Sequence, residues 1–137
     1  MNRTDLQRIA VQHLDAAKSL LQSGHWGPAY YLAGYSIECG LKACIARQFR
    51  EYDFPNLQTV KDSYTHDLGK LVRTASLSKE LRLAEDGSDV FKLNWATVKD
   101  WSADSRYEDR SQTRATGIIA AIDAKPNGVL EWITQHW

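Results

Sequence analysis

The chain has 137 residues, of which 43% are hydrophobic and 25% are charged, and this balance excludes both a disordered chain and a fibrous one. This length fits a single domain, predicted over residues 1–137, because two independent cores need a longer chain. The 17 basic residues balance the 17 acidic ones, so no general positive field attracts nucleic acid, and any such contact must be local.

Membrane and secretion signals are missing from the sequence. No stretch approaches the roughly 20 apolar residues that span a bilayer, and residues 1–5 do not begin the apolar run of a signal peptide. We therefore expect a cytoplasmic protein that makes no membrane contact.

Helical periodicity and capping signals predict an all-α fold, an antiparallel bundle of about five helices. Thr4 with Gln7 matches a capping box at the first helix, and Pro28 stands at the start of the second. Residues 53–64 are polar and contain a proline, so we expect them to be irregular, as we do residues 101–109. The expected helices are residues 4–22, 27–52, 65–77, 78–83, 90–101, 110–124 and 129–135.

The second expected helix carries a wide apolar stripe, which is typical of a central helix. Gly34 and Gly40 each cost roughly 1 kcal/mol in a helix interior, so we expect another element to pack closely against both. Cys39 and Cys44 would point about 140° apart on this helix, a poor geometry for a disulfide or a shared metal. We interpret both as buried, small apolar residues.

Glu38 and Lys42 lie four residues apart beside the apolar stripe. In one interpretation they form a half-exposed helix pair that stabilises by about 0.3–0.5 kcal/mol. In the other, one of the two side chains reaches a buried polar site.

Aromatic and basic residues gather near the expected irregular segment. Trp95 and Trp101 are typical core residues, whereas Arg106, beside Tyr107, needs a carboxylate, carbonyl or phosphate partner. Our candidate partner for Arg106 is Glu38. Arg106, Arg110 and Arg114 recur every four residues and would form either a solvated face or an edge that contacts phosphate.

None of the four histidines has metal-ligand spacing, so we expect no metal and no cofactor. His13 lies on the apolar side of the first helix, which indicates a core histidine with its own hydrogen bonds. His66, followed by Asp67 at a helix start, is either a catalytic base or a capping residue.

Residues 29–43, AYYLAGYSIECGLKA, resemble the second-helix signature of HEPN (higher eukaryotes and prokaryotes nucleotide-binding) domains. The resemblance continues through Thr65-His66-Asp67-Leu68 and through the stretch from Trp101-Ser102 to Ser105-Arg106-Tyr107. It therefore covers most of the chain in the family's order.

The resemblance implies an antiparallel helical bundle, commonly a symmetric homodimer, in bacterial toxin–antitoxin and phage-defence systems with nucleotidyltransferase partners. Many HEPN domains are metal-independent RNases with an Arg-x4-6-His motif, in which arginine holds the phosphate and histidine assists attack by the ribose 2′-hydroxyl. The only such match in this sequence is Arg8 to His13, which lies on the first helix instead of a later one. We do not transfer the nuclease residues to that pair.

Three hypotheses follow. In the first, the chain is a dimeric module that binds a nucleotide, RNA or a protein partner through a polar cluster of Glu38, Lys42, His66, Asp67, Trp101, Arg106 and Tyr107. In the second, it is an RNase toxin in which Arg106 grips the phosphate and His66 is the acid or base. In the third, the polar residues only fix the packing, and an aromatic patch near Trp132 and Trp137 forms the dimer.

Overall fold

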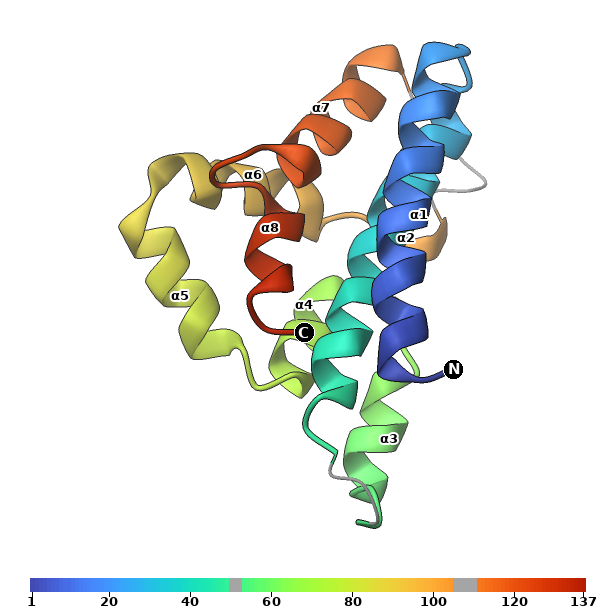
Figure 1. Cartoon of the computed structure of the whole chain (residues 1–137). Helices are drawn as coiled ribbons and strands as arrows, with labels where there is room; N and C mark the ends of the chain where they lie inside the picture. The colour runs from blue at the N-terminus through green and yellow to red at the C-terminus, as the bar shows by residue number, and fades with distance from the viewer. Residues whose placement is uncertain (50–52, 105–110) are drawn as a thin grey trace.

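The computed structural model describes residues 1–49, 53–104 and 111–137, which form eight α-helices and no strand (Figure 1). The all-α class is confirmed. The seven expected segments each overlap one of the eight described helices, and the remaining helix, Leu57–Ser63, was not expected. The helices are α1 (Arg3–Gln22), α2 (Trp26–Ala46), α3 (Leu57–Ser63), α4 (Leu68–Thr74), α5 (Ser78–Gly87), α6 (Asp89–Lys99), α7 (Gln112–Asp123) and α8 (Val129–Thr134).

The two long helices α1 and α2 form an antiparallel hairpin (Figure 1). Fully buried alanines such as Ala10 and Ala33 let the helices approach closely, and Ser36 Oγ donates to the Ala10 carbonyl over 2.6 Å. The capping residue of α1 is Asn2 instead of the predicted Thr4, because Asn2 and Asp5 each accept from the other's backbone N–H.

Helix α2 is the central element, and its two glycines mark close contacts, as predicted. A Cβ atom at Gly34 would overlap the indole of Trp101, and one at Gly40 would lie 3.0 Å from the Ile133 side chain. The segment after α6 and helix α8 therefore both pack directly against α2.

Helix α2 ends at Ala46, earlier than predicted. Residues 47–49 form a turn, and the predicted end at residue 52 lies outside the described residues. Ile45 is the last fully buried residue of the apolar stripe, whereas Arg47 and Gln48 are exposed. Continuing the helix here would bury little apolar surface.

The prediction of an irregular segment over residues 53–64 is wrong, because α3 occupies Leu57–Ser63. Asn56 caps this helix by accepting from the Thr59 N–H at 3.1 Å. None of its residues is buried, and it extends from one end of the molecule (Figure 1).

Later helix ends also differ from the predictions. Helix α5 extends to Gly87 instead of Leu83, and Ser88 then caps α6 by accepting from the Phe91 N–H at 3.1 Å. Ser111 caps α7 at 3.2 Å, and the predicted start of α7 at residue 110 lies outside the described residues.

Candidate functional site

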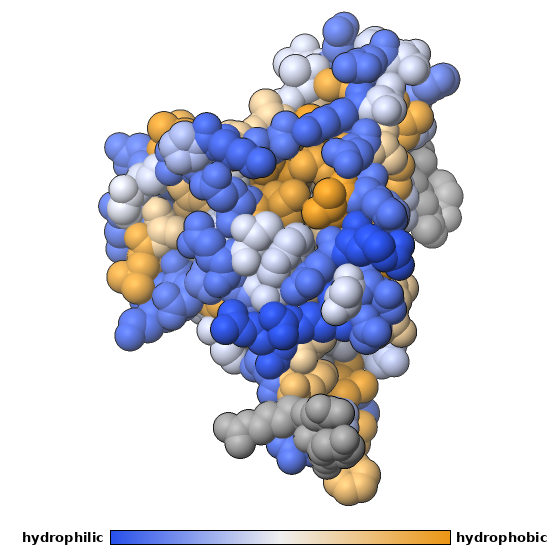
Figure 2. Space-filling model, in the orientation of Figure 1, coloured by the Kyte–Doolittle hydropathy of each residue, from blue (hydrophilic) through white to orange (hydrophobic). Residues whose placement is uncertain are grey.

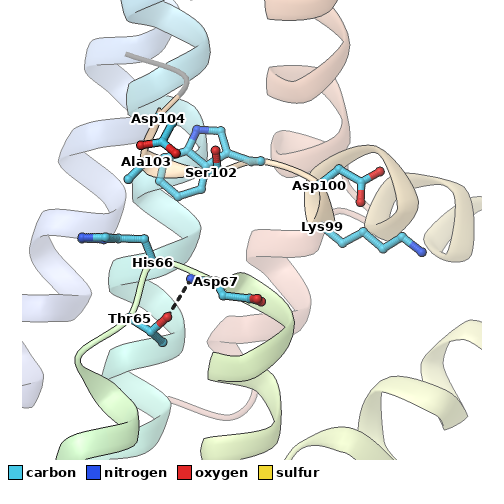
Figure 3. Close-up of a pocket in the computed structure, with 9 residues that line it drawn as sticks. Thr65, His66, Asp67, Lys99, Asp100, Ser102, Ala103 and Asp104 are labelled. Atoms are coloured by element: carbon cyan, nitrogen blue, oxygen red, sulfur yellow. Dashed lines mark hydrogen bonds between the residues drawn. The ribbon is translucent and has the colours of Figure 1, made fainter. Parts of the chain in front are cut away.

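Three of the residues singled out from the sequence, His66, Asp67 and Trp101, line a hollow of about 410 Å³. One wall is the connection from α3 to α4, residues 65–67, and the opposite wall runs from the end of α6 through residues 102–104 (Figure 3). Two segments more than thirty positions apart in the sequence therefore share one site.

Local folding holds both walls against α2. On one side, Asp67 caps α4 by accepting from the Lys70 N–H at 3.0 Å, and Leu68 is fully buried beside it. On the other side, Trp101 is 2% exposed, covers Gly34, and packs 6.0 Å from the Tyr31 ring. The walls are therefore anchored in the core, although the hollow itself is open.

Glu38 is the polar centre of this region, with only 1% of its surface exposed. Its carboxylate accepts from Lys42 Nζ at 2.9 Å, and both of its oxygens lie 2.9 Å from His66 Nδ1. Because a carboxylate only accepts, Nδ1 carries the proton of this hydrogen bond. The buried charge is thus matched by two donors from different elements, as buried carboxylates require.

The same contact orients the His66 ring at the edge of the hollow. The His66 side chain is 59% exposed even though Nδ1 is held by a buried carboxylate. Nε2 has no hydrogen-bond partner among the residues that the structure describes. A ring fixed at one nitrogen and open at the other can bind or transfer a proton at a defined position.

The pairing of Glu38 with Lys42, one of the two interpretations of these residues, is present, and the predicted pairing with Arg106 is not tested. Arg106, the candidate partner, lies outside the described residues, as do Tyr107 and Arg110, so their places in the site stay predictions. The pairing of Glu38 with His66 was not predicted. The signals were present, namely a glutamate beside the apolar stripe and a histidine at a helix start, but 28 residues separate them.

Charge within the described part of the hollow is mostly negative. Asp67, Asp100 and Asp104 line it with Lys99 as the only permanent cation of the described lining. Asp67 is already engaged as the cap of α4, whereas Asp100 and Asp104 are exposed. A bound phosphate would need more positive charge than these residues provide.

The two cysteines behave as buried, apolar residues, as predicted. Burial raises the pKa of the Cys39 thiol to about 11 and that of the Cys44 thiol to about 12, so both stay protonated at neutral pH. No group of three metal-ligating side chains occurs within residues 1–49, 53–104 and 111–137.

Other residues singled out from the sequence have structural roles. His13 Nδ1 lies 2.9 Å from the Ile9 carbonyl of its own helix, and the ring packs 5.1 Å from Tyr35. Arg8 points to solvent and pairs with Asp5 at 3.5 Å, so the Arg8–His13 match forms no joint site. Trp95 is a core residue at 5% exposure, as predicted.

The prediction that Trp132 belongs to an exposed aromatic patch is wrong. This side chain is only 7% exposed and packs 5.6 Å from the Phe91 ring inside the core. Trp137 is half-buried, and its carbonyl accepts from Arg3 Nη2 at 2.7 Å.

A second hollow, of about 420 Å³, lies between α1 and the C-terminal segment and has a different character. Figure 2 shows it as an apolar patch ringed by hydrophilic surface. Val11 and Leu130 contribute apolar surface, and Leu14 and Ile122 lie beneath. Lys18 and Asp123 pair across its rim at 2.8 Å. The polar chemistry is therefore concentrated at the His66 hollow.

A family model described as HEPN domain matches residues 4–125 of the chain. No curated protein and no solved structure matches it. Among the described helices, none is long and apolar enough to cross a membrane.

Proposed function

The chain belongs to the HEPN domain family, and from that premise we propose that it binds nucleotide or RNA at the hollow beside His66. In this proposal the module acts in a bacterial toxin–antitoxin or phage-defence system, as a homodimer and with a nucleotidyltransferase-type protein partner. The family assignment supports a nucleotide- or RNA-related helical module, and the site geometry supports where the ligand binds.

The observation that carries the proposal is the pairing of His66 with Glu38. A 1% exposed carboxylate is costly to bury, yet here it holds a side chain that is itself 59% exposed beside a hollow. Packing alone does not require this arrangement, because Lys42 already pairs with Glu38. It does fix a ring nitrogen where a ligand could reach it.

Phosphate recognition also needs a cation, and the described lining supplies only Lys99 as a permanent one. We assign that role to Arg106, which follows Asp104 by two positions in the sequence. An arginine can donate two parallel hydrogen bonds to one phosphate group. In the proposal, His66 and Arg106 therefore form the ligand-binding pair.

Fluorescence anisotropy with a labelled, mixed-sequence single-stranded RNA and with labelled mononucleotides tests the proposal. His66→Ala is expected to weaken binding by about tenfold, the effect of losing roughly 1.4 kcal/mol of contact. The matched control is His25→Ala, because His25 is an exposed histidine at the start of α2, about 20 Å of helix from Glu38. Equal affinities for the two variants, or no binding by the wild-type protein, would refute the proposal.

A second candidate function is metal-independent RNA cleavage, which the orientation of His66 favours. With Nδ1 held by Glu38, Nε2 is the atom that would accept the proton of a ribose 2′-hydroxyl. The resulting oxyanion would attack the adjacent phosphorus to form a 2′,3′-cyclic phosphate as the bond to the 5′-oxygen breaks, and that oxygen would take a proton from solvent. Arg106 would stabilise the negative charge on the phosphate.

Cleavage of the same RNA pool in EDTA separates the two functions. If the chain is an RNase, the wild-type and His25→Ala proteins cut, and the His66→Ala and Arg106→Ala variants lose activity while remaining folded. If the wild-type protein binds RNA and leaves it intact, the chain is a binding module and the enzyme candidate is wrong.

A further inference from the structure

A third hollow, of about 500 Å³, adjoins the candidate site. It lies among α4, α5 and α6 and shares Asp67, Lys99 and Asp100 with the His66 hollow. Because three lining residues belong to both, the two hollows adjoin each other. A ligand longer than one nucleotide could therefore enter both.

Three cations from three different helices line this third hollow: Arg73 from α4, Arg82 from α5 and Lys99 from α6. All three are exposed, and none forms an ion pair within 4.0 Å with any residue of the described ranges. A Cβ atom at Gly69 would lie 3.4 Å from Asp67 Oδ1 and 3.7 Å from Arg73 Nη1, so Arg73 is close to the boundary between the hollows.

The same hollow has one accessible apolar side chain, half-buried Leu81, above a floor of the core residues Val72 and Trp95 at 2% and 5% exposure. A sugar or base edge can pack on Leu81 while phosphates contact the cations at the rim.

We propose that this hollow is an extended subsite for a single-stranded RNA, whose phosphates contact Arg73 and Arg82 while another part of the strand occupies the His66 hollow. Lys99 belongs to both hollows and contacts the strand between them. This inference rests on the proposed function and adds that the ligand is an RNA strand instead of a single nucleotide.

Carboxylates in the same hollow make the sign of the ligand charge testable. Glu85 and Asp100 line it and would repel a phosphate, whereas Asp67 is already engaged with the Lys70 N–H. Neutralising Glu85 should therefore tighten the binding of an anionic strand and weaken the binding of a cationic ligand.

The experiment measures the affinity of a ten-nucleotide single-stranded RNA over a range of salt concentrations. Arg73→Gln combined with Arg82→Gln is expected to weaken binding by about tenfold or more and to reduce the salt slope by about 1.4, which is two phosphate contacts at roughly 0.7 each. Mononucleotide affinity should stay within about twofold, because one nucleotide does not reach both hollows. Glu85→Gln should tighten RNA binding.

The matched control neutralises two exposed cations elsewhere, Arg8→Gln on α1 and Lys125→Gln after α7. If both double variants weaken RNA binding equally, the effect is one of net charge and the subsite is wrong. If Glu85→Gln weakens binding, the subsite is wrong as well. If the wild-type protein binds neither RNA nor mononucleotide, the proposed function itself fails. If only the Arg73 and Arg82 variant loses affinity for RNA, the proposed function stands and the subsite is supported.

Discussion

Glu38 combines structural and chemical roles within one carboxylate. It has two donors: Lys42 lies on its own helix, and His66 lies on a connection that comes 28 residues later. The first contact comes with the helix, whereas the second forms only when the connection packs against α2. The two contacts should therefore differ in their effect on stability.

Removing Lys42 should cost more stability than removing His66. In Lys42→Met, the buried carboxylate keeps only the His66 donor, and we expect a loss of roughly 1–3 kcal/mol. His66→Ala leaves the Lys42 contact in place and should cost less. Urea denaturation of both variants gives the comparison, and an equal or reversed order would show that Lys42 is not the main counter-charge of Glu38.

Gly34 is required by the close approach of Trp101, which gives a stability prediction with an internal control. Gly34→Ala would force the buried indole to move, and overpacking of this kind costs about 1–3 kcal/mol. Gly117→Ala on α7 meets nothing within 4 Å and should stabilise by about 0.5–1 kcal/mol through helix propensity. Chemical denaturation measures both, and the same sign for the two variants would contradict this packing.

His136 should make stability depend on pH. Burial lowers the pKa of its imidazole, and Arg47 adds to this, while Glu80 opposes it. As pH decreases, His136 in the unfolded chain binds a proton near the ordinary pKa of 6.5, whereas His136 in the folded chain binds one only at a lower pH. The free energy of unfolding therefore falls as pH decreases from 6.5 to the pKa of His136 in the folded chain. The wild-type protein should lose more stability than His136→Gln between about pH 7.5 and about pH 5.5 in urea titrations. Equal losses would exclude His136 as the cause.

For single residues, burial in the core could be predicted from the sequence, whereas the hydrogen bond between Glu38 and His66 in the candidate site could not. The burial of Cys39, Cys44, Trp95 and Trp101 followed from residue type and helical position. The Glu38–His66 contact did not, because it depends on how a loop packs against α2, and no local pattern encodes that distance.

At the scale of helices, the long amphipathic elements were predictable and the short ones were not. Helix α1 ends at Gln22 as predicted, because the apolar periodicity stops there and Ser23-Gly24 follows. Helix α3 was missed because its seven residues bury nothing, so no apolar stripe indicated it. Its capping residue Asn56 was the one local signal, and without periodicity it was read as part of a polar loop.

The exposure of α3 predicts low local stability. None of its residues is buried and its main contact among the described helices is with α4, whereas most of α2 is buried. In native-state hydrogen exchange, amides of α3 should open with a free energy close to zero, and those in the middle of α2 should approach the global value. Comparable protection in the two helices would mean that α3 is covered in solution, for example by a partner.

At the scale of the whole molecule, the fold brings its polar residues to one side of the central helix. Trp101 packs on Gly34, and His66 hydrogen-bonds to Glu38. Through these two contacts, connections that are distant in the sequence both lie against α2. The HEPN resemblance of the second helix was a correct indication of the family. It could not locate the proposed ligand site, because the two hollows of that site are lined by α4, α5 and α6 together with the connections before α4 and after α6.

An NMR titration of the folded chain with single-stranded RNA shows whether RNA binds beside His66. Amide shifts that saturate with the ligand are expected at residues 65–67 and 99–104, and His66→Ala should need about tenfold more ligand to reach saturation. Binding beside His66 is excluded if no amide shifts, or if the shifts are confined to the apolar hollow around Leu14 and Leu130.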